Sequence, residues 1–229
     1  MASPQNMARS NILSKIRNQV AGNEENTARR AAVANRIANA PKGVIPERGQ
    51  LSPRKRLELF CERAEAVQTT IASVESYDDI GEAVSDYLRS RNLPQALRMG
   101  QDPRLGNADW STVPNLTREV GPTDGTDLVG LSHATTGVAE TGTLVLTSGA
   151  DNPTTVNFLP ENHIVVIHAS DIEGDYETAL DRVRQMNGKG QMPRTVNMIT
   201  GPSRSGDIEQ TILLGAHGPR SLHIIVVDD

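Results

Sequence analysis

Cysteine and aromatic side chains are scarce in this sequence of 229 residues. Cys61 is the single cysteine, so the chain cannot form an internal disulfide, and it lacks the roughly four thiolates that hold an iron–sulfur cluster. Aromatic residues make up 3% of the chain, so a core must be built mainly from aliphatic side chains. We therefore expect no disulfide framework and no cofactor on this chain.

A positive charge excess and long apolar runs are also missing. The formal net charge is -5, whereas proteins that bind nucleic acids usually present a basic face, so no nucleic-acid partner is expected. No apolar run approaches the ~18–20 residues of a membrane span, and the polar residues 1–10 do not resemble a secretion signal. These absences predict a soluble, cytoplasmic protein with no membrane span.

The first fifty residues predict a helical arm and a linker ahead of a larger domain at 51–229. Apolar residues at helical spacing indicate a short amphipathic helix at 10–20, while the Ala-rich stretch 24–40 is helical by propensity. Repeated proline and glycine between 41 and 53 mark the linker. The arm would dock on the body or on a neighbouring subunit; a partly disordered tail is the alternative.

The remainder of the chain alternates strand-like and helical segments. The unbroken apolar run at 164–167 is typical of a strand buried on both faces, and such strands form parallel sheets covered by helices. The chain is therefore predicted to have an α/β fold with a mostly parallel sheet. Strands are expected at 69–74, 96–99, 128–135, 143–147, 163–168, 195–199 and 222–227, helices at 57–67, 80–88, 176–186 and 207–214, and an irregular excursion at 100–122.

The segment 200–209 is the strongest candidate for a ligand site. It is predicted to join a strand to a helix at the carboxyl end of the strand, where open α/β sheets place their ligands. Small residues let backbone N–H groups approach an anion, and the helix N-terminus and Arg204 add positive charge. The alternative is a well-capped turn without a ligand. The predicted ligand-binding residues are Thr200, Gly201, Pro202, Ser203, Arg204, Asp207 and Glu209.

Two further glycine-flanked loops supply candidate catalytic groups. Glu140, in the loop 137–142, suits a nucleophile or base, and a solvated hairpin turn is the alternative. His217 lies between two glycines and suits proton transfer, although a loop histidine is more often a surface residue. Ligand-binding residues predicted beside them are Thr141, Gly142 and Gly218.

Signatures of metal binding and of esterases are absent from the sequence. No histidine pair has the HExxH or a comparable spacing, so no metal site is predicted. No G-x-S-x-G elbow supports a serine hydrolase. His163, His168 and His223 lie at or within predicted strands and are assigned to packing, while His133 is a weaker site candidate near the loop 137–142.

Several motifs follow one another in the second half of the chain. They are AETGTLVL at 139–146, LP at 159–160, HIV at 163–165, TGPS at 200–203, DIE at 207–209, Gly215, HGP at 217–219 and LH at 222–223. In combination they resemble the LUD domain of lactate utilisation proteins, and their order is most similar to the lactate utilisation protein C family. The resemblance extends from about residue 51 to the last residue.

The resemblance implies a three-layer α/β fold related to the NagB/RpiA/CoA-transferase group. It also implies a role in oxidising L-lactate to pyruvate together with iron–sulfur lactate utilisation proteins. Because this chain lacks cluster ligands, the iron–sulfur clusters are expected on the partner proteins.

Two functions from different classes remain open. One is a non-redox component of the lactate-oxidising system. The other is an enzyme or sensor that binds a small anion, such as a CoA ester, a sugar phosphate or a carboxylate, with Glu140 as nucleophile or base and His217 as acid or base. A scaffold whose glycine loops only make tight turns is a third, and a homo-oligomer is also left open.

Overall fold

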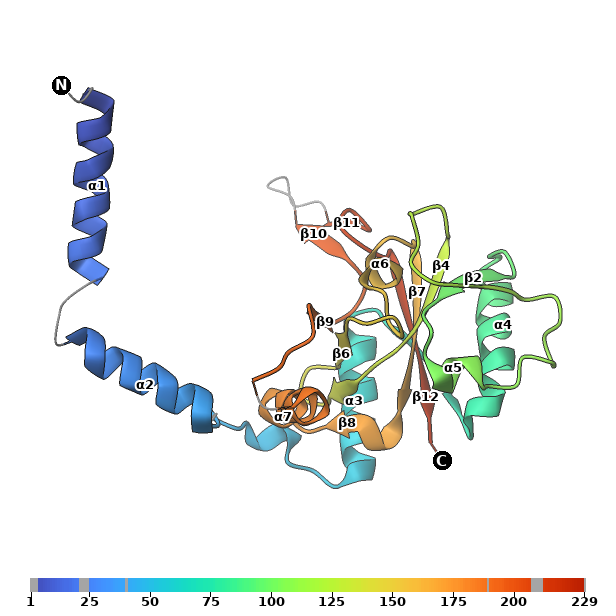
Figure 1. The fold of residues 1–229 in the computed structure, drawn as a ribbon. Helices are drawn as coiled ribbons and strands as arrows, with labels where there is room; N and C mark the ends of the chain where they lie inside the picture. The colour runs from blue at the N-terminus through green and yellow to red at the C-terminus, as the bar shows by residue number, and fades with distance from the viewer. Residues whose placement is uncertain (1–3, 21–24, 40, 189, 207–211, 229) are drawn as a thin grey trace. The chain divides into compact units, whose positions relative to one another are not determined.

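The computed structural model describes residues 4–20, 25–39, 41–188, 190–206 and 212–228. Contacts divide the chain into two units, Met1–Val44 and Ile45–Asp229, and Figure 1 shows the ribbon. The first unit contains α1 (Pro4–Val20) and α2 (Glu25–Asn39). The predicted N-terminal helices are thus present, and α1 begins six residues earlier than its apolar spacing predicts.

A six-stranded sheet forms the centre of the second unit. Every described pair of neighbouring strands is parallel, in the order β1-β12-β7-β4-β2-β3, which confirms the predicted mostly parallel sheet. The strands are β1 (Thr70–Val74), β2 (Ala96–Met99), β3 (Thr117–Val120), β4 (Val129–His133), β7 (Asn162–His168) and β12 (Ser221–Val227).

Strand β7, in the middle of the sheet, buries both of its faces. Along β7, Ile164 and Val166 pack with α4 (Ile80–Ser90), while Val165 and Ile167 pack with Phe60 of α3 (Pro53–Ala66). Successive side chains of a strand point to opposite faces, so this alternation places one helix layer on each side of the sheet. Figure 1 shows α3 and α4 on the two sides. The result is a three-layer α/β arrangement.

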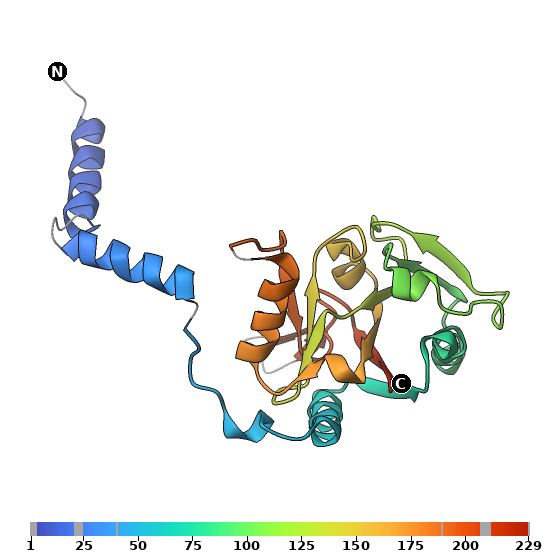
Figure 2. The ribbon, with the colours of Figure 1, turned by 60° about the horizontal axis from the view of Figure 1, so that its bottom comes forward.

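A second, smaller sheet packs beside this arrangement and has mixed strand directions. Its order is β8-β5-β6-β9, and Val138 and Val145 pack against α7 (Tyr176–Asn187). The segments 143–147 and 195–199 therefore belong to this second sheet and pair antiparallel. Its strands are β5 (Thr136–Val138), β6 (Thr143–Thr147), β8 (Ile172–Glu173) and β9 (Val196–Ile199). Figure 2 shows it from another side.

The predicted helix at 207–214 is wrong over its described part. β10 (Arg204–Gly206) pairs antiparallel with β11 (Ile212–Leu214), and residues 207–211 lie outside the described residues. Leu213 and Leu214 are exposed, so these apolar residues do not form the buried face of a helix. Gly215 N–H also donates to Ser203 O at 3.0 Å, which extends the hairpin ladder by one bond.

Short helical turns complete the described second unit. The excursion 100–122, predicted to be irregular, contains a short helix and strand β3. Among the described residues, no helix has the length and apolar character needed to cross a membrane. The short turns are η1 (Glu47–Gly49), η2 (Tyr77–Asp79), α5 (Pro103–Gly106), α6 (Thr154–Phe158) and η3 (Ala169–Asp171).

Candidate functional site

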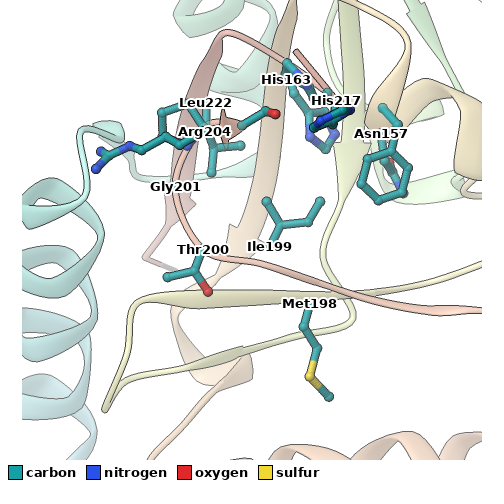
Figure 3. Close-up of a pocket in the computed structure, with 14 residues that line it drawn as sticks. Asn157, His163, Met198, Ile199, Thr200, Gly201, Arg204, His217 and Leu222 are labelled. Carbon is teal, nitrogen blue, oxygen red and sulfur yellow. The ribbon is translucent and has the colours of Figure 1, made fainter. Parts of the chain in front are cut away.

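A cavity of about 270 Å³ lies where α6, β9 and the amino-terminal ends of β7 and β12 meet (Figure 3). His163 is the second residue of β7 and Leu222 the second residue of β12, so the cavity lies at the amino edge of the parallel sheet. Thr200 directly follows β9, so the segment starts at the carboxyl end of its own strand as predicted. β9 belongs to the smaller sheet, however, and the cavity therefore does not lie at the carboxyl edge of the parallel sheet. This amino-edge cavity is lined by Asn157, Phe158, His163, Met198, Ile199, Thr200, Gly201, Pro202, Ser203, Arg204, His217, Gly218, Pro219 and Leu222.

Backbone hydrogen bonds join two of the predicted loops at this cavity. Ser203 N–H donates to Pro219 O at 2.8 Å, which fixes the segment 200–204 beside the segment 217–219. Gly201 has φ +74°, and a Cβ there would lie 2.8 Å from Val67 O, so only glycine fits the turn without strain. The two walls formed by the segments 200–204 and 217–219 were therefore predicted from the sequence.

The third wall contains a buried polar network that sequence reasoning missed. The Ser132 hydroxyl donates to Asn157 Oδ1 at 2.7 Å, so its oxygen is available to accept from His163 Nε2, 3.0 Å away. Complete burial lowers the pKa of His163 to about 3, so its ring is neutral. Ser132 and His163 are polar residues inside otherwise apolar strands, and this is the signal that could have identified the wall.

Within the described ranges, two nitrogens of this network have no hydrogen-bond partner. Because Nε2 of His163 carries the proton in this arrangement, Nδ1 is an acceptor, and it has no hydrogen-bond partner among the described residues. The same holds for Nδ2 of Asn157, which is a donor. Both residues are among those that line the cavity, and the acceptor and the donor are buried beside it.

Arg204 directs its charge away from these groups. Its Nη2 donates to the carbonyl of Val67, at the C-terminal end of α3, and Figure 3 shows the guanidinium extending away from His163 and His217. His217 itself is exposed at the cavity. The predicted ligand residues Asp207 and Glu209 lie outside the described residues.

Glu140 is held at another place and does not line the amino-edge cavity. Its side chain is 3% exposed, and its Oε2 accepts from Arg48 Nε at 3.0 Å and from Arg48 Nη2 at 2.9 Å. The predicted pairing of Glu140 with His217 in one composite site is therefore not formed. Glu140 is a buried carboxylate in an ion pair.

Thr141 and Thr143 connect the Glu140 loop to the cavity through hydroxyl groups. Thr143 Oγ1 lies 2.7 Å from Thr141 Oγ1 and 2.7 Å from Thr200 Oγ1, and it lies 2.9 Å from the Tyr176 hydroxyl. Gly142 instead packs against α3, since a Cβ there would lie 2.4 Å from Ala64 N. The predicted ligand residues Thr141 and Gly142 thus contact protein groups, and Thr200 is the link to the cavity.

Residues 45–51 form a strap along the second unit. Besides the Arg48 ion pair, Gln50 Nε2 donates to Asp175 Oδ2 at 2.8 Å. Gly49 and Gly174 approach so closely that a Cβ on Gly49 would lie 2.0 Å from Gly174 O. The strap, which the sequence assigns to a linker, is therefore part of the folded unit.

Replacing Arg48 tests this description of Glu140. We expect Arg48→Ala to lower the free energy of unfolding by about 1–3 kcal/mol, because it leaves a buried carboxylate without its partner. Adding Glu140→Gln should restore part of the loss, since the uncompensated charge is removed. Urea unfolding measures both. Arg54→Ala, which breaks an exposed pair with Glu58, is the control and should change stability by under ~1 kcal/mol; an equal effect of the two arginines would contradict the ion-pair role.

A second polar cluster lies at the opposite, carboxyl edge of the sheet. The ring of Tyr77 stacks with those of His133 and His168, with centroids 5.8 Å and 6.2 Å apart. His133 Nδ1 donates to Ala134 O at 2.7 Å, so its Nε2 accepts from the Tyr77 hydroxyl at 2.9 Å. Burial, with a smaller effect of Arg104, lowers the pKa of His133 to about 4. Within the described ranges, no cluster of three or more His, Cys, Asp or Glu side chains has a metal-binding arrangement.

The layers and the two sheets define a three-layer α/β protein, the predicted fold class. The model of the LUD domain matches residues 57–227, and the chain therefore belongs to the LUD domain family. A crystal structure of a DUF162 family protein from Deinococcus radiodurans has the same fold, with a TM-score of 0.58 at 22% identity. That similarity covers 77% of this chain and 99% of the other.

Some relatives of this chain have names that state a role. Lactate utilization protein C of Shouchella clausii is 38% identical over 101 residues, 44% of each chain. Its namesake from Geobacillus sp. strain WCH70 is 40% identical over 102 residues, 44% of this chain and 42% of that one. An uncharacterized protein of Neisseria meningitidis serogroup B is 34% identical over 146 residues, 61% of each chain. The chain thus spans less than two thirds of the length of these relatives.

Proposed function

We propose that this protein is a non-redox component of a cytoplasmic system that uses L-lactate. The observation that carries the proposal is the LUD domain, together with its similarity to proteins named lactate utilization protein C. In this system the chain acts beside iron–sulfur partner proteins, which transfer the electrons released when lactate becomes pyruvate.

The chemistry of Cys61 supports the non-redox part of the proposal. Burial, followed by the nearby charge of Glu65, raises the pKa of this thiol, so it stays protonated near neutral pH. A thiolate, not a thiol, is the ligand of metals and clusters and the nucleophile of redox exchange. One protonated thiol therefore suits a chain that leaves electron transfer to its partners.

Deleting the gene in the native host tests the proposed function. We expect growth on L-lactate as sole carbon source to be lost and growth on pyruvate to be kept, because pyruvate lies beyond the oxidation step. Restoring the gene should restore growth on lactate. Growth curves on both carbon sources are the measurement, and normal growth on lactate in a strain without a second copy would overturn the proposal.

The second candidate function is an enzyme or sensor for a small anion. The cavity favours it, because His163 and Asn157 are completely buried and each has a nitrogen without a hydrogen-bond partner in the described part of the chain. The two functions are compatible, since a component of a lactate system can also bind a ligand.

A further inference from the structure

The unpartnered pair at the amino-edge cavity calls for a group that both donates and accepts. Asn157 Nδ2 needs an acceptor and His163 Nδ1 needs a donor. A carboxylate or a ketone only accepts, whereas a hydroxyl does both. Resting on the proposed role in lactate use, we infer that this cavity binds a small 2-hydroxycarboxylate and recognises its hydroxyl group through Asn157 and His163.

The direction of the hydrogen bonds makes the site selective. The Ser132 hydroxyl donates to Asn157 Oδ1, so Nδ1 of His163 can become the donor only if that hydroxyl turns to Nε2 and the 2.7 Å bond to Asn157 is lost. A 2-oxo acid brings an acceptor to Nδ1 and leaves it unsatisfied. A buried polar atom without a partner costs as much as a lost hydrogen bond, so the 2-oxo acid binds more weakly. The site therefore distinguishes the substrate of lactate oxidation from its product.

Size and charge exclude the larger anions. The cavity volume of about 270 Å³ is below the ~300–1,000 Å³ of pockets that enclose drug-sized ligands, so this cavity by itself does not enclose a whole CoA ester. Phosphate groups are usually held by arginine forks, and the Arg204 guanidinium is bonded to Val67 O instead. A small carboxylate is the class that remains.

The rim of the cavity supplies polar groups for the carboxylate. His217 and His163 both line the cavity, and their side chains overlap in the view of Figure 3. Ser203, which also lines the cavity, is fixed by the bond between its N–H and Pro219 O. An acid whose hydroxyl reaches Asn157 and His163 thus places its carboxylate toward the His217 loop.

Three acids of matched size test the inference on the full chain. L-Lactate, pyruvate and propionate share three carbons and a carboxylate and differ at the second carbon, which carries a hydroxyl, an oxo group or only hydrogen. Isothermal titration at constant ionic strength should give lactate a Kd at least ~10-fold lower than that of either analogue. Equal Kd values for the three acids, or no binding of any up to about 10 mM, would overturn the inference.

A variant localises the binding. Asn157→Ala should raise the Kd for lactate at least ~10-fold, to a value close to the Kd for propionate. Ser85→Ala removes a buried hydroxyl on α4, on the other side of the sheet, and should leave the Kd unchanged. If Asn157→Ala does not fold, the three-acid comparison on the unmodified protein still decides. Failure here leaves the growth test of the proposed function standing, and failure of the growth test leaves a measured preference for lactate standing.

Discussion

Lowering the pH from 7 to 5 is expected to reduce the free energy of unfolding by about 5 kcal/mol, because three buried histidines take up protons when the chain unfolds. Burial is the main cause in each. It lowers the pKa of His163 to about 3 and that of His133 to about 4. Burial likewise lowers the pKa of His223 to about 4, against a hydrogen bond that the ring donates to the Thr70 backbone and that raises it.

The direction of this pH dependence follows from the number of protons bound by the folded and the unfolded chain. Below about pH 6.5 the unfolded chain protonates these rings while the folded chain keeps them neutral, so the unfolded state binds more protons. Stability is therefore fully present above that pH and is lost as the pH falls toward the folded values near 3 to 4. Asp102, whose pKa is lowered by hydrogen bonds to Arg104 against the larger effect of burial, adds a loss in the same direction at lower pH.

Urea unfolding at pH 7, 6 and 5 measures this dependence. His163→Gln should reduce the number of protons taken up by about one. Ser132→Ala is the matched control, because it removes the partner of the ring and keeps the ring: it should lower stability at every pH with the same pH dependence. A free energy that stays constant from pH 7 to 5 would contradict the assignment of neutral, buried rings.

Gly142→Ala is expected to destabilise the protein by about 3 kcal/mol or more. Gly142 has φ +66°, a conformation that alanine adopts at a cost. The added Cβ would also lie 2.4 Å from Ala64 N and 2.7 Å from Arg63 C, which are backbone atoms of α3, so the whole helix would have to move. Thermal and urea unfolding report the loss.

Gly106→Ala is the control for that substitution. A Cβ at Gly106 meets nothing within 4 Å, and this residue lies in the short helix α5 with ordinary φ. The free energy of unfolding of the Gly106→Ala variant should differ from that of the unmodified protein by under ~1 kcal/mol. If the two alanine variants were equally stable, the close packing of α3 on Gly142 would be disproved, and a direct role in ligand binding would again be open for this glycine.

The buried strands of the parallel sheet could be predicted because an apolar run within each segment is enough to identify it. The apolar run of β12 identifies a strand buried on both faces wherever it pairs, and prediction and structure differ by one residue at its start. Which sheet a strand joins depends on distant partners. Thr143–Thr147 pairs with Val196–Ile199, about fifty residues later, and nothing within either segment shows that they form a separate sheet.

The site was predicted in part for the same reason. Glycine and proline mark the loops 200–204 and 217–219, so two cavity walls were found. Ser132 and Asn157 are 25 residues apart, and neither has a flanking pattern that shows they share a hydrogen bond. The partner of Glu140 lies 92 residues earlier, in a segment that composition assigns to a linker. An ion pair between residues so far apart in the sequence cannot be predicted from the spacing of neighbouring residues.

The strap at 45–51 also decides where this domain can be cut. A fragment that begins at residue 57, where the LUD match starts, keeps all the described strands and helices α4 to α7, and it shortens only α3. It loses Arg48 and Gln50, however, and would leave the carboxylates of Glu140 and Asp175 without those partners. The second unit begins at Ile45, so a fragment that starts there keeps these side-chain contacts, which lie outside the strands and the longer helices.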